Sequence, residues 1–399
     1  MARNSPKSRK FKTRLRQQAF DRRHAQVQTL GRIIVSVVTV ASTVLSFTVL
    51  GFSWQALGIA ALGVVSVLSI LLNIYLWKES RGEDELVKQI AFLTPSTGDQ
   101  PFYSSMLTGL VRTASLALGQ NYVIIPSMPT QNFETVSIWA LFASLEDRQL
   151  GIDGLFFIPD DPDEHFEELV GFHEERGDIP LVLVDVYFDL DNCDERTRAR
   201  LPSFVGGDEV AGGKMAAELM VSSVREARED IPDAPRFAIV NGGSARWEMQ
   251  RSKAFREEIR SVWPAAEFVE TPSIPYSRTK AFEATLELMH GLAVDRQIDV
   301  LGIFACNDDM AIGARGAISR LHREEFQFTS PPQIVGYDGI PEIREYLGSG
   351  DHYIAGSVDV RIDEQARVAI SLMQKLIRAG EPTTEVRLVV PNKLVRDVG

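Results

Sequence analysis

From Lys88 onward, short apolar runs alternate with amphipathic stretches, a pattern typical of a mostly parallel α/β sheet. The predicted strands are Gln89–Leu93, Tyr122–Ile125, Leu155–Ile158, Leu181–Val184, Ser203–Val205, Phe237–Val240, Val300–Phe304, Gln333–Val335, Ile354–Val358 and Val386–Val390. Helices are predicted in most of the gaps, for example over Val210–Ala227, Thr279–Leu292 and Glu364–Arg378. Ten strands exceed the usual size of one sheet. The pattern therefore favours two lobes, each built around a doubly wound sheet.

The segment before this domain has a different pattern, because residues 33–77 contain no charged side chain. As one helix it would extend about 68 Å, roughly twice the hydrocarbon thickness of a bilayer. A break at residues 51–55 divides it into two runs, 33–50 and 56–76, each of spanning length. Trp54 suits one membrane interface, and Tyr75 with Trp77 suits the other. The sequence predicts a transmembrane hairpin that anchors the chain.

Charge sets the expected orientation of this hairpin. Residues 1–32 form a basic arm with ten Lys or Arg and one acid, whereas the net charge of the whole 399-residue chain is −12. By the positive-inside rule, both ends of the hairpin face the cytoplasm, with residues 78–88 as a linker. The prediction is a multi-pass plasma-membrane protein with a cytoplasmic domain; if only one segment crosses, the domain is extracytoplasmic. The acidic body argues against nucleic acid as a partner.

Polar side chains follow two of the predicted strands at the point where each ends. Asn307 and Asp308 lie in the segment Phe304–Ala314 (FACNDDMAIGA), and Asp338 lies in Ile334–Pro341 (IVGYDGIP). The carboxyl ends of parallel strands form the ligand crevice of an open α/β sheet. Helix capping alone is the alternative explanation, since Asn and Asp satisfy the exposed N–H groups of a first helical turn.

Motifs of catalysis and metal binding are not found. The sequence contains no HExxH, GxSxG or phosphate-binding loop, and its two cysteines offer no metal-ligand spacing. We therefore expect no enzyme activity, no catalytic residues, no metal and no cofactor. The glycine pairs 206–207 and 212–213 lack a following Lys-Ser or Lys-Thr, so a turn and close helix packing are expected there.

Several segments carry a resemblance to a known family. They are Phe304–Ile318 (FACNDDMAIGARGAI), Ile334–Glu342 (IVGYDGIPE), Phe204–Met220 (FVGGDEVAGGKMAAELM) and, more weakly, Gln100–Leu110 and Gly151–Asp163. From about residue 89 to 399, the chain resembles the type I periplasmic binding proteins and the related sugar-binding domains of lactose-repressor-like regulators. The resemblance implies two lobes, joined by three hinge strands, that close over one ligand. It assigns residues 89–202 and 360–381 to lobe 1, and residues 203–359 and 382–399 to lobe 2.

The resemblance also implies a set of ligand-binding residues, which are Gln100, Phe102, Tyr103, Asp163, Arg251, Tyr276, Asn307 and Asp338. Planar Asp, Asn and Arg groups suit vicinal hydroxyls, and aromatic rings suit the apolar face of a sugar. Two departures stand out: Gln100 replaces the usual Asn, and Val360 falls where many sugar receptors have Gln. These departures argue against ribose specificity, and a polyol, modified sugar or nucleoside is an alternative ligand.

Structural roles remain as alternatives for four of these residues. Phe102 can belong to the core, Asp163 can cap the helix that follows, Arg251 can pair with a surface acid, and Tyr276 can be a turn residue.

Three functions remain open at this point. The first is a membrane-anchored binding protein that senses a small polar ligand by closing its cleft, with a membrane protein such as a permease or signalling protein as partner. The second is the extracytoplasmic substrate-binding component of an ABC sugar transporter. The third is an interaction scaffold that keeps the fold without binding a ligand.

Overall fold

Two six-stranded sheets organise the part of the chain that is described by the computed structural model. That part comprises residues 87–95, 100–116, 122–129, 139–143, 151–159, 162–175, 179–188, 194–243, 246–380 and 384–395. It belongs to one unit of the chain, Leu86–Gly399. The predicted basic arm (1–32), the hairpin (33–77) and all of the linker except residues 87 and 88 lie outside the described residues.

The first sheet has the strand order β13-β5-β4-β3-β1-β2, and all of its neighbours are parallel. Its strands are β1 (Lys88–Leu93), β2 (Tyr122–Ser127), β3 (Gly154–Phe157), β4 (Leu181–Val184), β5 (Ser203–Gly207) and β13 (Val386–Val389). The three central strands β3, β4 and β5 are buried along their whole length. This burial explains why their sequences read as continuous rather than alternating apolar runs.

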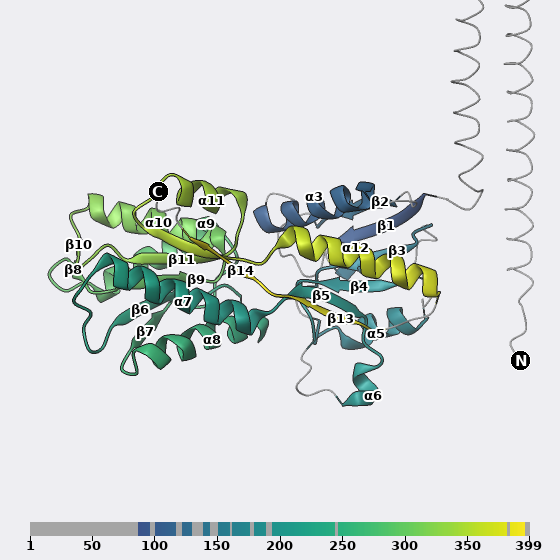
Figure 1. Ribbon diagram of the computed structural model, residues 1–399, viewed down its shortest axis with the longest axis horizontal. Helices are drawn as coiled ribbons and strands as arrows, with labels where there is room; N and C mark the ends of the chain where they lie inside the picture. Colours follow the sequence, from purple (N-terminus) through teal and green to yellow (C-terminus); the bar gives the residue numbers. More distant parts are fainter. Residues whose placement is uncertain are drawn as a thin grey trace, which may run out of the picture. The chain divides into compact units, whose positions relative to one another are not determined.

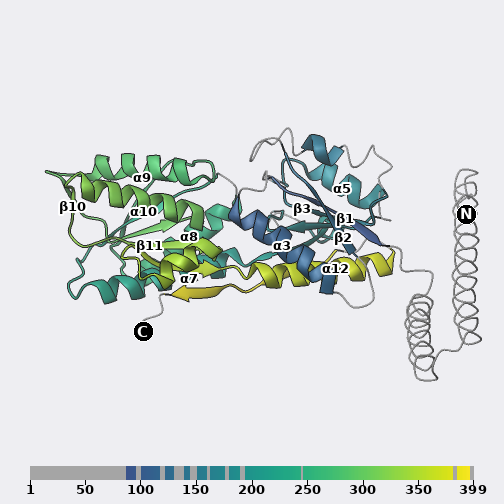
Figure 2. The ribbon, with the colours of Figure 1, turned by 90° about the horizontal axis from the view of Figure 1, so that it is seen from above.

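Helices cover both faces of the first sheet (Figures 1 and 2). Ile90, Phe92 and Phe156 share a cluster with residues of α3 (Pro101–Leu116) and α12 (Ile362–Ala379), which lie side by side. The alternate residues, such as Ala91 and Phe157, pack with α5 (Phe166–Glu175). A short helix, α6 (Glu195–Arg198), precedes β5 and is capped by Asp194.

The second sheet has the order β14-β12-β11-β9-β6-β7, in which only the β12–β14 pair is antiparallel among the described pairs. Its strands are β6 (Arg236–Val240), β7 (Glu267–Glu270), β9 (Gly302–Ala305), β11 (Gln333–Asp338), β12 (Ile354–Asp359) and β14 (Asn392–Val395). A two-stranded ribbon of β8 (Gln297–Ile298) and β10 (Gln327–Phe328) stands apart from it.

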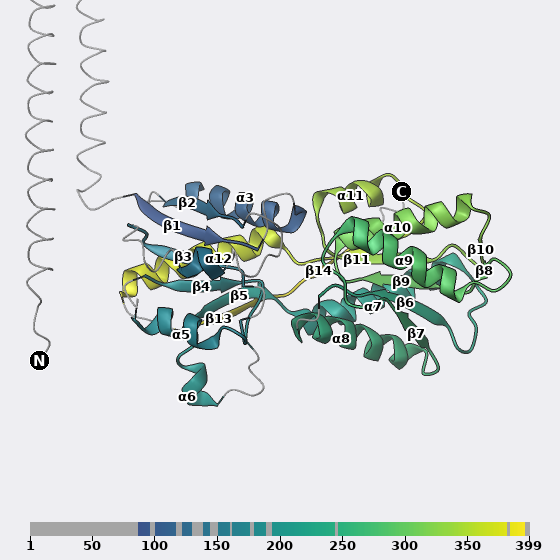
Figure 3. The ribbon, with the colours of Figure 1, turned by 180° about the vertical axis from the view of Figure 1, so that it is seen from behind.

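Two pairs of helices enclose the second sheet (Figure 3). One pair is α7 (Glu209–Ala227) with α8 (Arg246–Val262), and the other is α9 (Arg278–Leu292) with α10 (Asp308–Arg323). Phe237, Phe304 and Tyr337 pack in the same cluster as α7, whereas Ala238 and Ala305 pack with α10. The last helix of this lobe is α11 (Pro341–Gly348). The two-lobed α/β architecture predicted from the sequence is therefore confirmed.

The described chain passes between the lobes at three places, after β5, after β12 and between β13 and β14. The division differs from the predicted boundaries, because strands β5 and β13 pair with each other in the first sheet. Residues 203–207 and 386–389 thus belong to lobe 1. The change of lobe comes after each strand rather than before it, since β5 is fully buried between β4 and β13.

Candidate functional site

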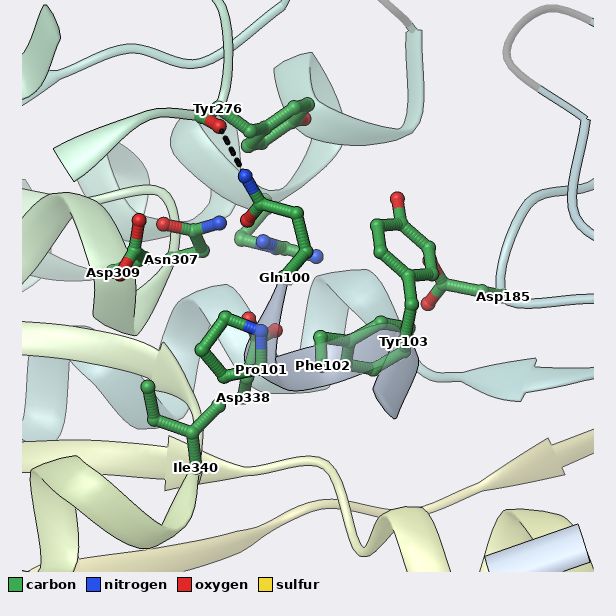
Figure 4. Close-up of a pocket in the computed structure, with 11 residues that line it drawn as sticks. Gln100, Pro101, Phe102, Tyr103, Asp185, Tyr276, Asn307, Asp309, Asp338 and Ile340 are labelled. Atoms are coloured by element: carbon green, nitrogen blue, oxygen red, sulfur yellow. Dashed lines mark hydrogen bonds between the residues drawn. The ribbon is translucent and has the colours of Figure 1, made fainter. Parts of the chain in front are cut away.

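A pocket lies between the two lobes at the carboxyl ends of strands from both sheets (Figure 4). Its described lining residues are Gln100, Pro101, Phe102, Tyr103, Asp185, Arg251, Tyr276, Asn307, Asp309, Asp338 and Ile340. Seven of the eight residues that the sequence suggested are brought together here. The eighth, Asp163, is not among the described lining residues. It is exposed and lies ahead of α5, which begins only at Phe166.

The first lobe supplies a loop and the start of α3. Gln100 follows the loop after β1, and Phe102 and Tyr103 lie in the first turn of the helix. Their rings meet edge to face with centroids 5.2 Å apart. Phe102 is buried and belongs to the core cluster, as the structural alternative predicted, and it also lies in the pocket wall.

A hydrogen bond joins the lobes across this pocket. The Gln100 Nε2 group donates to the backbone carbonyl of Tyr276, at 3.2 Å, as Figure 4 shows. The volume open to the centres of water-sized molecules is about 40 Å³. On the same measure, one bound water needs roughly 10–15 Å³. The space suits a few waters rather than a hexose. A sugar must therefore separate Gln100 from Tyr276 or displace other side chains.

Asp185 is the acid that the first lobe places in the pocket, directly after β4. Its backbone has a φ of 68°, a left-handed conformation that non-glycine residues rarely adopt. Burial and the negative charge of Glu209 raise the pKa of Asp185 to about 7, against the opposing effect of Arg251. We did not predict Asp185 from the sequence, although it follows the buried strand LVLV as Asp338 follows its strand. The strand-end criterion would have found it.

Arg251 is the basic group of the described pocket lining, and contacts with Glu209, Cys306 and Tyr337 help to hold it. Its Nε donates to Glu209 Oε2 at 2.6 Å, and its Nη1 donates to the carbonyl of Cys306. Its guanidinium lies 3.5 Å from the ring centroid of Tyr337, a cation–π arrangement. Burial opposes ionisation of Arg251, but Glu209 outweighs it and keeps the pKa well above its ordinary value. Arg251 does form an ion pair, as the structural alternative predicted. The pair is buried rather than on the surface, since Arg251 is only 3% exposed.

Close packing of α7 brings Glu209 to Arg251. A Cβ atom at Gly212 would overlap the Tyr337 hydroxyl, and one at Gly213 would overlap the carbonyl oxygen of Arg251. Helix α7 begins at the N-cap Asp208, whose side chain accepts from Ala211 N at 2.9 Å. The prediction of close helix packing at 212–213 is confirmed. Residues 206–207 lie in β5, so the turn expected there is wrong.

Three consecutive polar residues at the start of α10 have three different roles. Asn307 is the N-cap, and its Oδ1 accepts from Met310 N at 2.8 Å while the residue also lines the pocket. Asp308 is buried and accepts from Ser357 Oγ at 2.6 Å and from Ile340 N at 2.9 Å. Asp309 lines the pocket and accepts from Arg278 Nη2 at 2.7 Å. Burial raises the pKa of Asp308 to about 7, although its hydrogen bonds work in the opposite direction.

Asp338 ends β11 with a φ of 114° and faces the pocket. Its side chain accepts no hydrogen bond from a described residue, although the residue is only 8% exposed. Burial raises the pKa of Asp338 well above its ordinary value, and the charges of Asp308, Asp185 and Glu209 add to this effect while Arg251 opposes it. A strained backbone and electrostatic repulsion at the same residue are typical of functional positions.

The chemistry of the pocket is that of polar recognition. It combines carboxylates, amides and a guanidinium with the rings of Phe102, Tyr103 and Tyr276. Such groups accept from and donate to vicinal hydroxyls and pack against the carbon skeleton of a sugar or polyol. Within the described residues, no group of three His, Cys, Asp or Glu side chains is placed to hold a metal ion. The fold and the pocket together define a two-lobed protein with an interlobe binding site for a small polar molecule.

The chain belongs to the family described as the periplasmic binding protein domain, whose model matches residues 90–382. This result confirms the resemblance inferred from the motifs. A ribose import binding protein of Salmonella typhimurium is 24% identical over 312 residues, covering 78% of this chain and 91% of that protein. A D-apiose import binding protein of Paraburkholderia graminis is 23% identical over 261 residues, covering 61% and 76% of the two chains.

Solved structures share the fold. An ABC transporter periplasmic solute binding protein from Actinobacillus succinogenes, with bound D-allose, superposes with a TM-score of 0.64 at 22% identity, covering 78% of this chain and 98% of that one. An ABC transporter solute binding protein from Mycobacterium smegmatis, with bound glycerol, gives 0.61 at 23% identity, covering 78% and 96%. At these identities the similarity establishes the fold, while the ligands belong to those proteins.

The predicted localisation needs correction. We expected a multi-pass plasma-membrane protein with two spans and a cytoplasmic domain, but the relatives are import binding proteins and the family is a periplasmic one. In the described ranges, no helix combines the length and apolar character needed to cross a bilayer. The residues on which the prediction rested, 33–77, lie outside those ranges.

Proposed function

We propose that this protein is the extracytoplasmic substrate-binding component of an ABC-type importer and that it captures a sugar or polyol in the interlobe pocket. The observation that carries the proposal is the pocket itself, to which both lobes contribute polar groups beside aromatic rings. The relatives named for ribose and D-apiose import, and the structural neighbours with bound D-allose and glycerol, support the same ligand class. The role is binding and delivery, without a catalytic step.

The binding residues in this proposal come from both lobes. Asp185 and Asp338 accept from ligand hydroxyls, Asn307 donates its amide N–H, and Phe102 and Tyr103 cover an apolar face. Since Arg251 is already bound to Glu209 and Cys306, its part is to hold the wall of the pocket. Closure of the lobes then excludes water from these contacts.

A thermal-shift screen of the whole protein tests the proposal. D-Ribose, D-apiose, D-allose, myo-inositol and glycerol are suitable probes, because a ligand at 100 times its Kd stabilises a protein by about 2.7 kcal/mol. At least one of them should raise the Tm of the wild type and leave that of Asp338→Ala unchanged. The apo fold of the variant, followed by circular dichroism, should be intact.

The other functions give different results. A scaffold without a ligand would respond to no sugar or polyol in the screen. If Asp338→Ala responded as fully as the wild type, the ligand would bind elsewhere and the interlobe pocket would lose its role. Both results contradict the proposal.

A further inference from the structure

The charges around the interlobe pocket do not balance. Its described lining includes three acids, Asp185, Asp309 and Asp338, and one base, Arg251. Glu209 and Asp308 stand directly behind this lining, since Glu209 pairs with Arg251 and both Glu209 and Asp308 influence the pKa of Asp338. When Arg278 beside Asp309 and Arg344 near Asp308 are also counted, five carboxyl groups face three guanidinium groups, of which Arg278 and Arg344 also pair with Glu342 and Asp359. The site is acidic even by the standard of this acidic chain.

Three of the five carboxyl groups are satisfied within the second lobe. Asp309 accepts from Arg278 at 2.7 Å, and Arg278 also pairs with Glu342. Glu209 is bound to Arg251 at 2.6 Å. Asp308 accepts from a hydroxyl and from a backbone N–H. These groups need no ligand.

Asp185 and Asp338 are different, because neither side chain accepts a hydrogen bond or forms an ion pair with a described residue. They come from opposite lobes and both have positive φ, at 68° and 114°. The charge of Asp185 contributes to the raised pKa of Asp338, so the two carboxyl groups are within electrostatic reach of each other. Figure 4 shows both among the residues that line the pocket.

Arg251 does not neutralise this pair. Its guanidinium is engaged by Glu209, by the Cys306 carbonyl and by the Tyr337 ring. One positive charge shared with Glu209 leaves the two carboxyl groups without a counter-charge of their own. Burial and the neighbouring acids raise the pKa of both groups, and a bound cation would restore their charged forms. A neutral sugar supplies hydroxyl donors to them but no charge, and an acidic sugar adds repulsion. A ligand with an ammonium group supplies both donors and charge, and charge-assisted hydrogen bonds are roughly twice as strong as neutral ones.

We propose that the pocket selects a cationic polyhydroxy ligand, a sugar or polyol with a protonated primary amine that sits between Asp185 and Asp338. The inference rests on the proposed function and narrows its ligand class. The hydroxyl groups of such a ligand use the side chain of Asn307, and its carbon skeleton packs on Phe102 and Tyr103. The amine closes the gap between the lobes by bridging one carboxylate from each.

Isothermal titration of the whole protein at pH 7 with two matched series tests this inference. One series is 1-amino-1-deoxy-D-glucitol, D-glucitol and D-gluconate, and the other is 6-amino-6-deoxy-D-glucose, D-glucose and D-glucuronate. Within a series only one terminal group changes from amine to hydroxyl to carboxylate. In at least one series the amine should bind roughly tenfold more tightly than its neutral parent, and the acid more weakly than both.

Three variants locate the effect. Asp185→Asn and Asp338→Asn should each reduce the ratio between amine and neutral parent to about threefold or less, because each removes one negative charge and keeps an acceptor. Glu325→Gln removes the same charge at an exposed loop position outside the pocket, where the side chain is 88% exposed. It should leave the ratio unchanged.

The outcomes separate this inference from the proposed function. Neutral sugars that bind as tightly as their amines would overturn the cationic preference and leave sugar binding standing. A preference equally reduced by Glu325→Gln would also overturn it, because the effect would then come from overall charge. If no member of either series and no neutral sugar bound, both proposals would fall together.

Discussion

The two lobes build their halves of the pocket in different ways. The second lobe presents Arg251, Asn307 and Asp309, each fixed by hydrogen bonds to its own helices and loops. The first lobe presents Gln100, Phe102 and Tyr103 from the start of one helix, and its described polar contact across the pocket is Gln100 with Tyr276 of the other lobe. Hydrogen bonds within the second lobe fix its side of the pocket, whereas the first lobe makes a hydrogen bond to the second.

This difference suggests a division of labour. A wall whose side chains are already paired loses little conformational entropy when a ligand binds, so it gives affinity and orientation. A wall of aromatic rings, one amide and Asp185 adapts to the shape of the ligand that the second lobe holds. We therefore expect substitutions in the second lobe to change stability as well as binding, and substitutions in the first lobe to change mainly closure and binding.

The largest effect is expected at Arg251. Arg251→Met removes the partner of the buried Glu209 carboxylate, and a broken buried pair costs about 3–5 kcal/mol. Urea unfolding should show a loss of this size. Glu209→Gln in the same chain removes the stranded charge and should recover part of the loss. A loss below about 1 kcal/mol for Arg251→Met would mean that the network does not stiffen the second lobe.

A smaller effect is expected from relief of backbone strain at Asp338. Asp338→Gly replaces a residue at a φ of 114° with one that tolerates it and also removes a buried carboxyl group, so the free energy of unfolding should rise by about 1 kcal/mol. Ligand binding should be lost at the same time.

Glu325→Gly is the matched control, since Glu325 has a φ of 66° in an exposed loop outside the pocket. It should stabilise the fold similarly and leave binding unchanged. Urea unfolding and titration of both variants measure the two quantities. If Asp338→Gly bound ligand normally, the strained backbone would have no bearing on recognition.

The smallest effect is expected at Gln100, whose side chain donates a hydrogen bond to the Tyr276 carbonyl across the two lobes. One such bond is worth about 0.5–1.5 kcal/mol, so Gln100→Ala should shift the unliganded population toward open forms by roughly two- to tenfold. Single-molecule energy transfer between a dye on α5 and one on α9 reports this shift. An unchanged distribution would show that the contact follows closure rather than favouring it, and urea unfolding should change little.

Much of the fold was predictable from the sequence, because fully buried parallel strands leave continuous apolar runs. The ten predicted strands all correspond to observed ones, from β1 to β13. The missed strands have a physical explanation: β7 (EFVE) is exposed at both ends, and β14 (NKLV) is a largely exposed edge strand with polar residues. The ribbon strands β8 and β10 have only two residues each.

The site was predictable where a side chain follows a strand and less so elsewhere. Asn307 and Asp338 are predicted by that criterion, and Asp185 satisfies it too although it is not among the predicted residues. The partnership of Arg251 with Glu209 was not predictable, since 42 residues separate them and only the close approach at Gly212 and Gly213 brings them together. Positive φ at non-glycine residues has no signature in the sequence.

The repeated passage of the chain between the lobes has a consequence for biosynthesis. The first lobe begins at β1 but is completed only by α12 and β13, which start about 270 and 300 residues later along the chain. The second lobe runs from α7 to β12 without interruption and lacks only its edge strand β14. A ribosome thus releases a nearly complete second lobe while the first still exposes the surface that α12 will cover. The lobe that is made first is expected to finish folding last.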